Sequence, residues 1–379
     1  MNTKNKYSSD SEHIINLADD IAAFIQNEPD GSDDKFNQLA LRLFEYQFNA
    51  NTAYNKYCVK RNATPETVKS WMDIPAVPTT AFKEIPLCCF PPDNAVKVLT
   101  SSGTTDQTKR STLYYDELGL KMLTVSAQET QRQHVFVGVD KVRAMLFAPP
   151  PQAVPNLALA NFIPIGIAKH LIGQPNFYVN KEGLDFPGLV EGLKKAQEEN
   201  VPVILLGATF TYVHFIDFCS SQGISFNLPE GSIFQDGGGY KGQAREIGKE
   251  EFLKMVSETF GLPDYQIINS YGMSEMTCGF TDNVLYNHVN GIDEPRFKMI
   301  PHWARTVIVD PEKLEPIAKG KTGLLRHYCL GNFSNVIGVQ TDDLGHETGS
   351  GFEVTGRAKG AEARGCSIAA DELISAQKT

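Results

Sequence analysis

A run of small hydroxyl residues follows an apolar segment near residue 100. Within "VKVLTSSGTTDQTKR" the successive residues are Ser101, Ser102, Gly103, Thr104 and Thr105. Because the run has no apolar period, we predict a loop and not a part of the core. Hydroxyls and backbone N–H groups can surround a phosphate where glycine lets the main chain approach closely. The Walker pattern is not met, since no second glycine precedes Lys109, and a plain polar surface loop is the alternative.

Three further polar turns follow predicted strands later in the chain. They lie in "QDGGGYKG", in "NSYGMSEMT", and in the pair "QTDDLG" and "VTGRAKG". Their candidate residues are Gly238, Gly239, Tyr271, Ser274, Glu275, Asp343 and Arg357. Each turn alone is typical of an ordinary strand end or a solvated loop. The four stretches together, in this order, favour a nucleotide site.

In this order the four stretches resemble the adenylate-forming superfamily of acyl-CoA synthetases, peptide-synthetase adenylation domains and luciferases. Within that superfamily, "DIPAVPTTAFK", "LDFPGLVEGLKKA", "PVILLGATFTYV", "TDDLG" and "RGCSIAA" are similar to the LuxE-type acyl-protein synthetases. The resemblance covers nearly the whole chain, from about Asp73 to the end. It implies an α/β fold of the adenylate-forming large domain, with mixed and parallel sheets flanked by helices and a small β subdomain.

The resemblance implies that the chain binds ATP together with Mg²⁺. The loop after residue 100 would hold the ATP phosphates, Ser274 would contact the α-phosphate, and Glu275 would bind the magnesium ion. These residue types suit the attack of a carboxylate on the α-phosphate, because that step brings negative charges together and needs donors and a metal to neutralise them.

The nucleoside part of ATP would use the remaining candidate residues. By the same resemblance, Tyr271 would flank the adenine together with Gly238 and Gly239. Asp343 and Arg357 would hold the ribose. The usual Thr-Gly-Asp of the superfamily has an aspartate at its second position here, which is a departure from the pattern.

Cys366 is the candidate acceptor of the acyl group. Ordinary superfamily members continue for roughly another hundred residues after the ribose arginine, whereas only residues 358–379 follow it here, so we expect the mobile domain to be missing. A helix beginning just after Cys366, and nearby Arg364, would lower its pKa. A thiolate attacking an acyl adenylate gives a thioester and releases AMP. A small buried residue is the alternative, and the LuxE-type resemblance alone selects Cys366.

The pattern of apolar residues divides the chain into four predicted segments. Residues 1–90 have mainly helical spacing, and residues 91–300 alternate between strands and helices as in βαβ units with a parallel sheet. Residues 301–355 contain short β segments separated by turns, and residues 356–379 form a short tail in place of the usual mobile domain.

Composition excludes several classes of protein. A net charge of −10 with scattered basic residues argues against a nucleic-acid surface. No apolar leader or stretch of eighteen apolar residues is present, so we expect a cytoplasmic protein without a membrane span. The seven cysteines form no CxxC pair, which predicts mostly buried thiols and no zinc site. The histidines have no paired metal-ligand spacing, and a core position is expected for His214.

The sequence therefore predicts an AMP-forming acyl-protein synthetase. ATP would activate a carboxylic acid to acyl-AMP, and the resemblance implies that this acid is a fatty acid. Cys366 would then take the acyl group and pass it to a partner acyl reductase. Two alternatives stay open: an aryl- or acyl-CoA ligase of the phenylacetate type, and a nucleotide-binding pseudoenzyme or scaffold subunit. The sequence identifies neither the acid nor the pathway.

Overall fold

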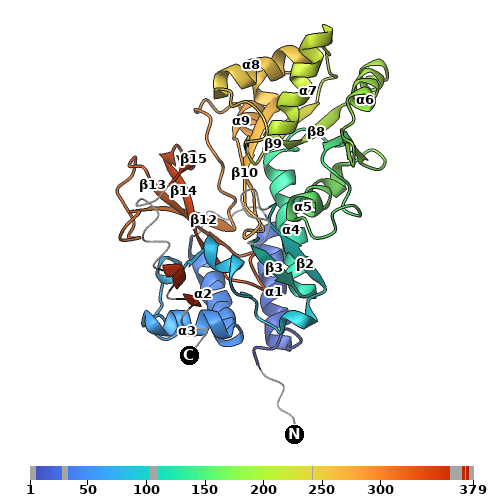
Figure 1. Ribbon diagram of the computed structural model, residues 1–379. Helices are drawn as coiled ribbons and strands as arrows, with labels where there is room; N and C mark the ends of the chain where they lie inside the picture. Colours follow the sequence, from blue (N-terminus) through green and yellow to red (C-terminus); the bar gives the residue numbers. More distant parts are fainter. Residues whose placement is uncertain are drawn as a thin grey trace. The chain divides into compact units, whose positions relative to one another are not determined.

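The computed structural model describes residues 6–27, 33–102, 110–240, 242–358, 369–371 and 373–374. The chain folds into two compact units (Figure 1). The first unit contains Met1–Glu129, Met273–Cys278 and Ile300–Thr379, and the second contains Thr130–Gly272 and Gly279–Met299. These bounds differ from the four predicted segments, because the N-terminal helices and the C-terminal strands pack into one unit that also includes the turn after residue 272.

A six-stranded sheet is the centre of the second unit in the described part of the chain, with the order β11-β10-β9-β8-β4-β5. Neighbouring strands from β10 to β5 run parallel, and β11 is antiparallel to β10. The bounds are β4 Arg143–Phe147, β5 Asn176–Phe177, β8 Val203–Ala208, β9 Ile233–Gly237, β10 Ile267–Tyr271 and β11 Phe280–Thr281. The predicted parallel sheet of an α/β core is confirmed.

Helices cover both faces of this sheet because successive strand residues point to opposite sides. On one face, Leu205 and Phe234 pack against side chains of α6, α7 and α8. On the other face, Ile204 and Ile233 pack against α5, α9 and the residues that follow α4. The bounds are α4 Glu117–His134, α5 Ala158–Ile167, α6 Phe186–Glu198, α7 Thr209–Gln222, α8 Lys249–Phe260 and α9 Val284–Asn290.

The first unit combines N-terminal helices with an antiparallel sheet. The helices are α1 Glu12–Gln26, α2 Asp33–Ala50 and α3 Thr52–Lys60. The strands are β12 Ala304–Val309, β13 Gly323–Cys329, β14 Gly338–Thr348 and β15 Gly351–Arg357, with β1 Val77–Pro78 parallel to β14. A separate hairpin pairs β2 Lys97–Thr100 with β3 Thr112–Tyr115. The predicted β-rich region is therefore present, and β1 joins it from far earlier in the chain.

Short elements complete the described chain. They are η1 Trp71–Asp73, η2 Thr79–Lys83, η3 Pro92–Asn94, η4 Ala168–His170, η5 Asp264–Gln266, β6 Val179–Asn180 and β7 Gly183–Leu184. Residues 369–371 and 373–374 are helical, where the sequence predicts a terminal helix. No helix in the described ranges is both long enough and apolar enough to cross a bilayer.

Two predictions about single residue types can be compared with the structure. The six cysteines in the described ranges are free and buried, as predicted. The core position expected for His214 is wrong, because its side chain lies on the exposed side of α7 and its Nε2 is 2.9 Å from the Gln243 carbonyl oxygen.

Candidate active site

The hydroxyl-rich loop connects β2 to β3 of the hairpin, in the first unit. The Ser101 N–H donates to the Ser111 carbonyl oxygen at 3.0 Å, and the Ser111 N–H donates to Ser101 Oγ at 3.1 Å. The Ser101 hydroxyl oxygen therefore also closes the hairpin, a role that the sequence did not predict. Ser102 is exposed. Gly103, Thr104 and Thr105 lie outside the described residues.

Glu275 is a buried carboxyl group in the same unit. Burial raises its pKa above the usual value, and the Ser111 hydroxyl and the charges of Lys83 and Arg357 act in the opposite direction. Burial, and after it the charge of Glu275, raises the pKa of Tyr115. The structure thus brings one carboxyl group together with two cations and two hydroxyl groups. Ser274 is the half-buried residue before it.

Several buried polar atoms of η2, of β3 and of the segment leading into β3 lack a hydrogen-bond partner in the described part of the chain. They are Thr80 Oγ1, Arg110 Nε and the Tyr115 hydroxyl. Thr80 lies on η2, which packs against β3 and ends at Lys83. Buried polar groups in folded proteins nearly always have a partner. Unsatisfied polar groups in the unit that carries this carboxyl group and these cations are what an anionic, metal-carrying ligand such as a nucleotide phosphate would complete.

A buried asparagine fixes the turn that carries Glu275. Asn332 Oδ1 accepts hydrogen bonds from the Thr277 N–H at 2.9 Å and from the Thr277 hydroxyl at 3.2 Å, and Asn332 Nδ2 donates to the Glu275 carbonyl oxygen at 3.1 Å. Gln47 on α2 donates to the Asn332 carbonyl oxygen at 2.7 Å and so holds the asparagine from behind. A Cβ atom at Gly331 would lie 2.4 Å from Thr277 Oγ1, so only glycine fits there without a shift.

Asp343 and Arg357 are brought together across β14 and β15, where they are direct cross-strand partners. Arg357 Nε lies 3.8 Å from Asp343 Oδ1, and its Nη2 lies 3.9 Å from Asp342 Oδ2. The Arg357 side chain is 65% exposed, so solvent screens these pairs and leaves the guanidinium able to bind a ligand. The same charge reaches Glu275, which joins this pair to the carboxyl site within the first unit.

The remaining candidates lie in the second unit, after two neighbouring parallel strands. Gly238 and Gly239 follow β9 with φ values of 75° and 65°, which glycine adopts without strain. Tyr271 is the last residue of β10, is half-buried, and has its ring 6.0 Å from that of Phe280. A Cβ atom at Gly237 would lie 2.9 Å from the Ser270 carbonyl oxygen, so the two strand ends approach closely.

The charged and polar side chains that the motifs did not reveal are Lys83 and Asn332. Lys83 lies in the stretch "DIPAVPTTAFK", which carried the family resemblance but no assigned role. Asn332 follows β13 and has no sequence signal. Cys366 lies outside the described residues.

The donor set agrees with a metal carried by the nucleotide. The described ranges contain no group of three or more histidine, cysteine, aspartate or glutamate side chains that could hold a metal ion by themselves. Magnesium is commonly bound by one or two carboxylates together with substrate phosphates and water. Glu275, as a single carboxyl group beside unsatisfied donors, fits that arrangement.

The fold is the one found in adenylate-forming ligases. The structure matches 2-hydroxyisobutyryl-CoA ligase in an open conformation with 2-HIB-AMP and CoA, with a TM-score of 0.63, 12% identity, and coverage of 88% of this chain and 75% of that chain. The same ligase in the postadenylation state matches with a TM-score of 0.61 and 13% identity, over 86% of this chain and 66% of that chain. At such identity the match shows the fold alone.

The chain belongs to the LuxE family of acyl-protein synthetases, whose family model matches residues 3–375. It is 25% identical over 364 residues to the long-chain-fatty-acid–luciferin-component ligase of Vibrio harveyi, covering 90% of this chain and 89% of the relative. It is 23% identical over 322 residues to the ligase of the same name from Aliivibrio fischeri, covering 82% and 78%. The resemblance inferred from the sequence motifs is confirmed.

Proposed function

We propose that this protein uses ATP to activate a long-chain fatty acid as acyl-AMP. The family and the names of the two ligases support the reaction class and the acid. The observation that carries the proposal is the buried Glu275, on which the charges of Lys83 and Arg357 act, together with the unsatisfied Arg110 Nε and Tyr115 hydroxyl of the same unit. In the reaction a fatty-acid carboxylate oxygen forms a bond to the α-phosphorus, and the bond to the bridging oxygen breaks so that pyrophosphate leaves.

Residues of the first unit are assigned to the phosphates and the ribose. Lys83 and Arg357 supply positive charge, and the hydroxyl loop from Ser101 supplies donors, where negative charge accumulates in the transition state. Glu275 is the proposed protein ligand of the Mg²⁺ that accompanies ATP, and that ion would neutralise phosphate charge when bound. Ser274 is assigned to the α-phosphate.

The nucleoside contacts follow from the turns. Tyr271, with Gly238 and Gly239, is assigned to the adenine, because an aromatic ring and bare backbone pack well against a flat base. Asp343 and Arg357 are assigned to the ribose, since a carboxylate accepts from the two ribose hydroxyls and the exposed guanidinium donates to oxygen.

We further propose that Cys366 receives the acyl group and passes it to a partner acyl reductase. Its thiolate would attack the acyl carbon of acyl-AMP, the C–S bond would form, and AMP would leave. The family description as an acyl-protein synthetase and the "RGCSIAA" stretch support this step.

The activation step is tested by fatty-acid-dependent exchange of labelled pyrophosphate into ATP. The wild type should exchange, and Glu275→Gln should lower the exchange rate by about a hundredfold or more, because a neutral amide cannot replace a carboxylate as metal ligand. Glu294→Gln, at an exposed glutamate, is the matched control and should exchange like the wild type. Absence of acid-dependent exchange in the wild type would refute the activation and favour a nucleotide-binding scaffold.

The acceptor is tested separately with ATP, Mg²⁺ and a labelled long-chain fatty acid, followed by denaturing electrophoresis. Hydroxylamine-labile label should appear on the wild type and on Cys219→Ala, whose thiol is buried, and it should be lost in Cys366→Ala. Equal labelling of Cys366→Ala would end the acceptor assignment. Release of acyl-CoA when CoA is supplied would favour the CoA ligase alternative.

A further inference from the structure

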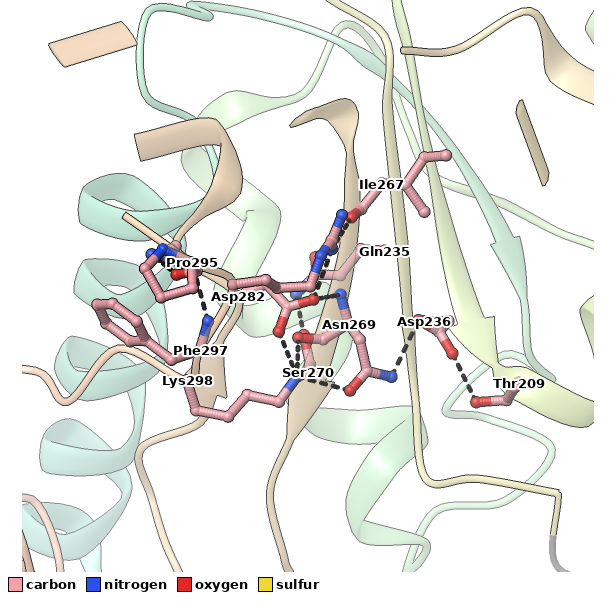
Figure 2. A network of polar contacts seen from close by, with 12 residues as sticks. Thr209, Gln235, Asp236, Ile267, Asn269, Ser270, Asp282, Pro295, Phe297 and Lys298 are labelled. Carbon is pink, nitrogen blue, oxygen red and sulfur yellow. Dashed lines mark hydrogen bonds and ion pairs between the residues drawn. The ribbon is translucent and has the colours of Figure 1, made fainter. Parts of the chain in front are cut away.

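A connected set of buried polar side chains lies within the second unit (Figure 2). Lys298 Nζ donates to the Asn269 carbonyl oxygen at 2.7 Å, to Asn269 Oδ1 at 2.6 Å and to Asp282 Oδ1 at 2.7 Å. The Asn269 N–H donates to Asp282 Oδ2 at 3.0 Å, and Asn269 Nδ2 donates to Asp236 Oδ1 at 3.1 Å. The Thr209 hydroxyl donates to Asp236 Oδ2 at 2.6 Å. Asn269 therefore uses its main chain and both ends of its amide in one network.

The charged members of the network are deeply buried and mutually dependent. The Lys298 and Asp282 side chains are 9% and 4% exposed. Burial alone would raise the pKa of Asp282, but Lys298 and Arg296 together bring it below the usual value. Burial lowers the pKa of Lys298, against the attraction of Asp282. A buried ion pair adds little net stability compared with well-packed apolar side chains. Stability alone therefore does not explain why these ions lie at this point of the fold.

The network joins the two neighbouring strands that carry the candidate adenine residues. Asn269 on β10 is the register partner of Asp236 on β9. Tyr271 lies two residues after Asn269, and the turn from Gly237 to Gly239 begins directly after Asp236. A shift of the Asn269 amide would move both strand ends, because the amide is held by Lys298 on one side and holds Asp236 on the other (Figure 2).

We propose that Lys298 is a positioning residue for the nucleotide. Through Asn269 it fixes the end of β10 that presents Tyr271, and through Asn269 and Asp236 it fixes the turn that contains Gly238 and Gly239. The inference rests on the proposed function and extends it. Lys298 would determine how tightly the site binds ATP, without contacting the fatty acid.

Arg296 offers a matched control within the same ion network. It also binds Asp282, with Nη1 at 2.8 Å from Oδ2. Its other contacts are at the opposite end of β10, where Nη1 donates to the Ile267 carbonyl oxygen at 2.7 Å and Nη2 donates to Asp264 Oδ2 at 2.7 Å. Replacing either cation by methionine removes one buried charge next to Asp282, but only Lys298→Met removes the hydrogen bonds to the Asn269 carbonyl oxygen and Oδ1.

The experiment compares Lys298→Met and Arg296→Met in the full chain. We measure the thermal midpoint, the apparent KM for ATP and the apparent KM for the fatty acid in pyrophosphate exchange. Lys298→Met should raise the KM for ATP about tenfold while the KM for the acid stays within about twofold. Arg296→Met should lower the thermal midpoint comparably and leave both KM values within about twofold. Equal KM values for ATP in the two variants would overturn the proposal.

Amide hydrogen exchange of the nucleotide-free chain gives a second readout. Residues 237–240 and 269–272 should exchange faster in Lys298→Met than in Arg296→Met, and identical exchange in the two variants would refute the positioning role. If Lys298→Met does not fold, Lys298→Arg replaces it, because a guanidinium keeps the charge but cannot place one nitrogen between Asn269 and Asp282. A wild type without acid-dependent pyrophosphate exchange would refute the proposed function itself, and this outcome is seen before any variant is compared.

Discussion

Replacing Asn332 by alanine tests whether one buried amide holds the turn of Glu275. The substitution leaves the Thr277 N–H and the Glu275 carbonyl oxygen without their partner, and also the Val336 carbonyl oxygen, which accepts from Asn332 Nδ2 at 3.2 Å. Each buried backbone group left unsatisfied costs about 1 kcal/mol or more. We therefore expect the free energy of unfolding to fall by about 3 kcal/mol, and the exchange activity of the folded remainder to fall because Glu275 loses its anchor.

Urea unfolding followed by tryptophan fluorescence measures this change. The chain has two tryptophans, Trp71 and Trp303, and both are buried in the first unit together with Asn332. Asn49→Ala is the matched control, because Asn49 Nδ2 makes a single exposed hydrogen bond to the Glu45 carbonyl oxygen at 2.7 Å on α2. The control should change the stability by less than about 1 kcal/mol. If the free energy of unfolding fell by less than about 1 kcal/mol in Asn332→Ala, the role of Asn332 in holding the Glu275 turn would be refuted.

Three further predictions concern titration and thiol reactivity. Burial raises the pKa of Glu275, so the folded chain holds the carboxyl proton more tightly than the unfolded chain does. The unfolding free energy of the wild type, relative to that of Glu275→Gln, should therefore fall as pH rises above about 4.5. Urea unfolding at several pH values measures this difference, and a difference that grows with pH would contradict the prediction. Burial lowers the pKa of His327 to about 3. Relative to His327→Gln, the wild type should therefore lose stability as pH falls from about 6.5 toward about 3, by at most about 1.4 kcal/mol per pH unit. The same assay measures this loss, and an equal pH dependence of both proteins would contradict the prediction. Burial raises the pKa of Cys58 to about 12 and those of Cys88 and Cys219 to about 11. Burial alone would raise the pKa of Cys329 and hydrogen bonds lower it, but its thiol is buried, as are those of Cys89 and Cys278. Rapid alkylation by iodoacetamide, followed by mass spectrometry, should therefore be confined to Cys366 and vanish in Cys366→Ala; rapid labelling of that variant would refute the assignment.

The sequence predicted elements well where a local apolar period decides the structure. The apolar spacing predicts a helix from Asp116 to about Gln133, and the structure has α4 there, Glu117–His134. It also predicts a helix from Ala244 to Phe260, but α8 begins only at Lys249, because Gly248 is extended and the Tyr240 hydroxyl donates to the Ile247 carbonyl oxygen at 2.8 Å. A tertiary contact of the preceding segment overrides the helical period there.

The candidate site was predictable only where its residues belong to a recognisable sequence motif. The turn with Ser274 and Glu275 is readable as a motif, and Asp343 and Arg357 were paired by the family resemblance before the β14–β15 register placed them side by side. Lys83 and Asn332 come from segments about 190 and 60 residues from Glu275 in the chain. Their relation to the carboxyl group exists only after the first unit has folded, so no spacing rule could indicate it.

The buried ions of the second unit were likewise not predictable from sequence spacing, and the structure gives the physical reason. A parallel sheet is built most stably from apolar side chains on both faces, as β8 is in "VILLGA". The neighbouring strands β9 and β10 instead carry Asp236 and Asn269. Asp236 accepts from Thr209 and Asn269, and Asn269 accepts from Lys298 of a later segment. Apolar replacements would serve stability at least as well. The polar residues lie shortly before Gly238, Gly239 and Tyr271 in the sequence, and the proposed positioning role would explain their placement by fixed geometry at those turns more than by stability.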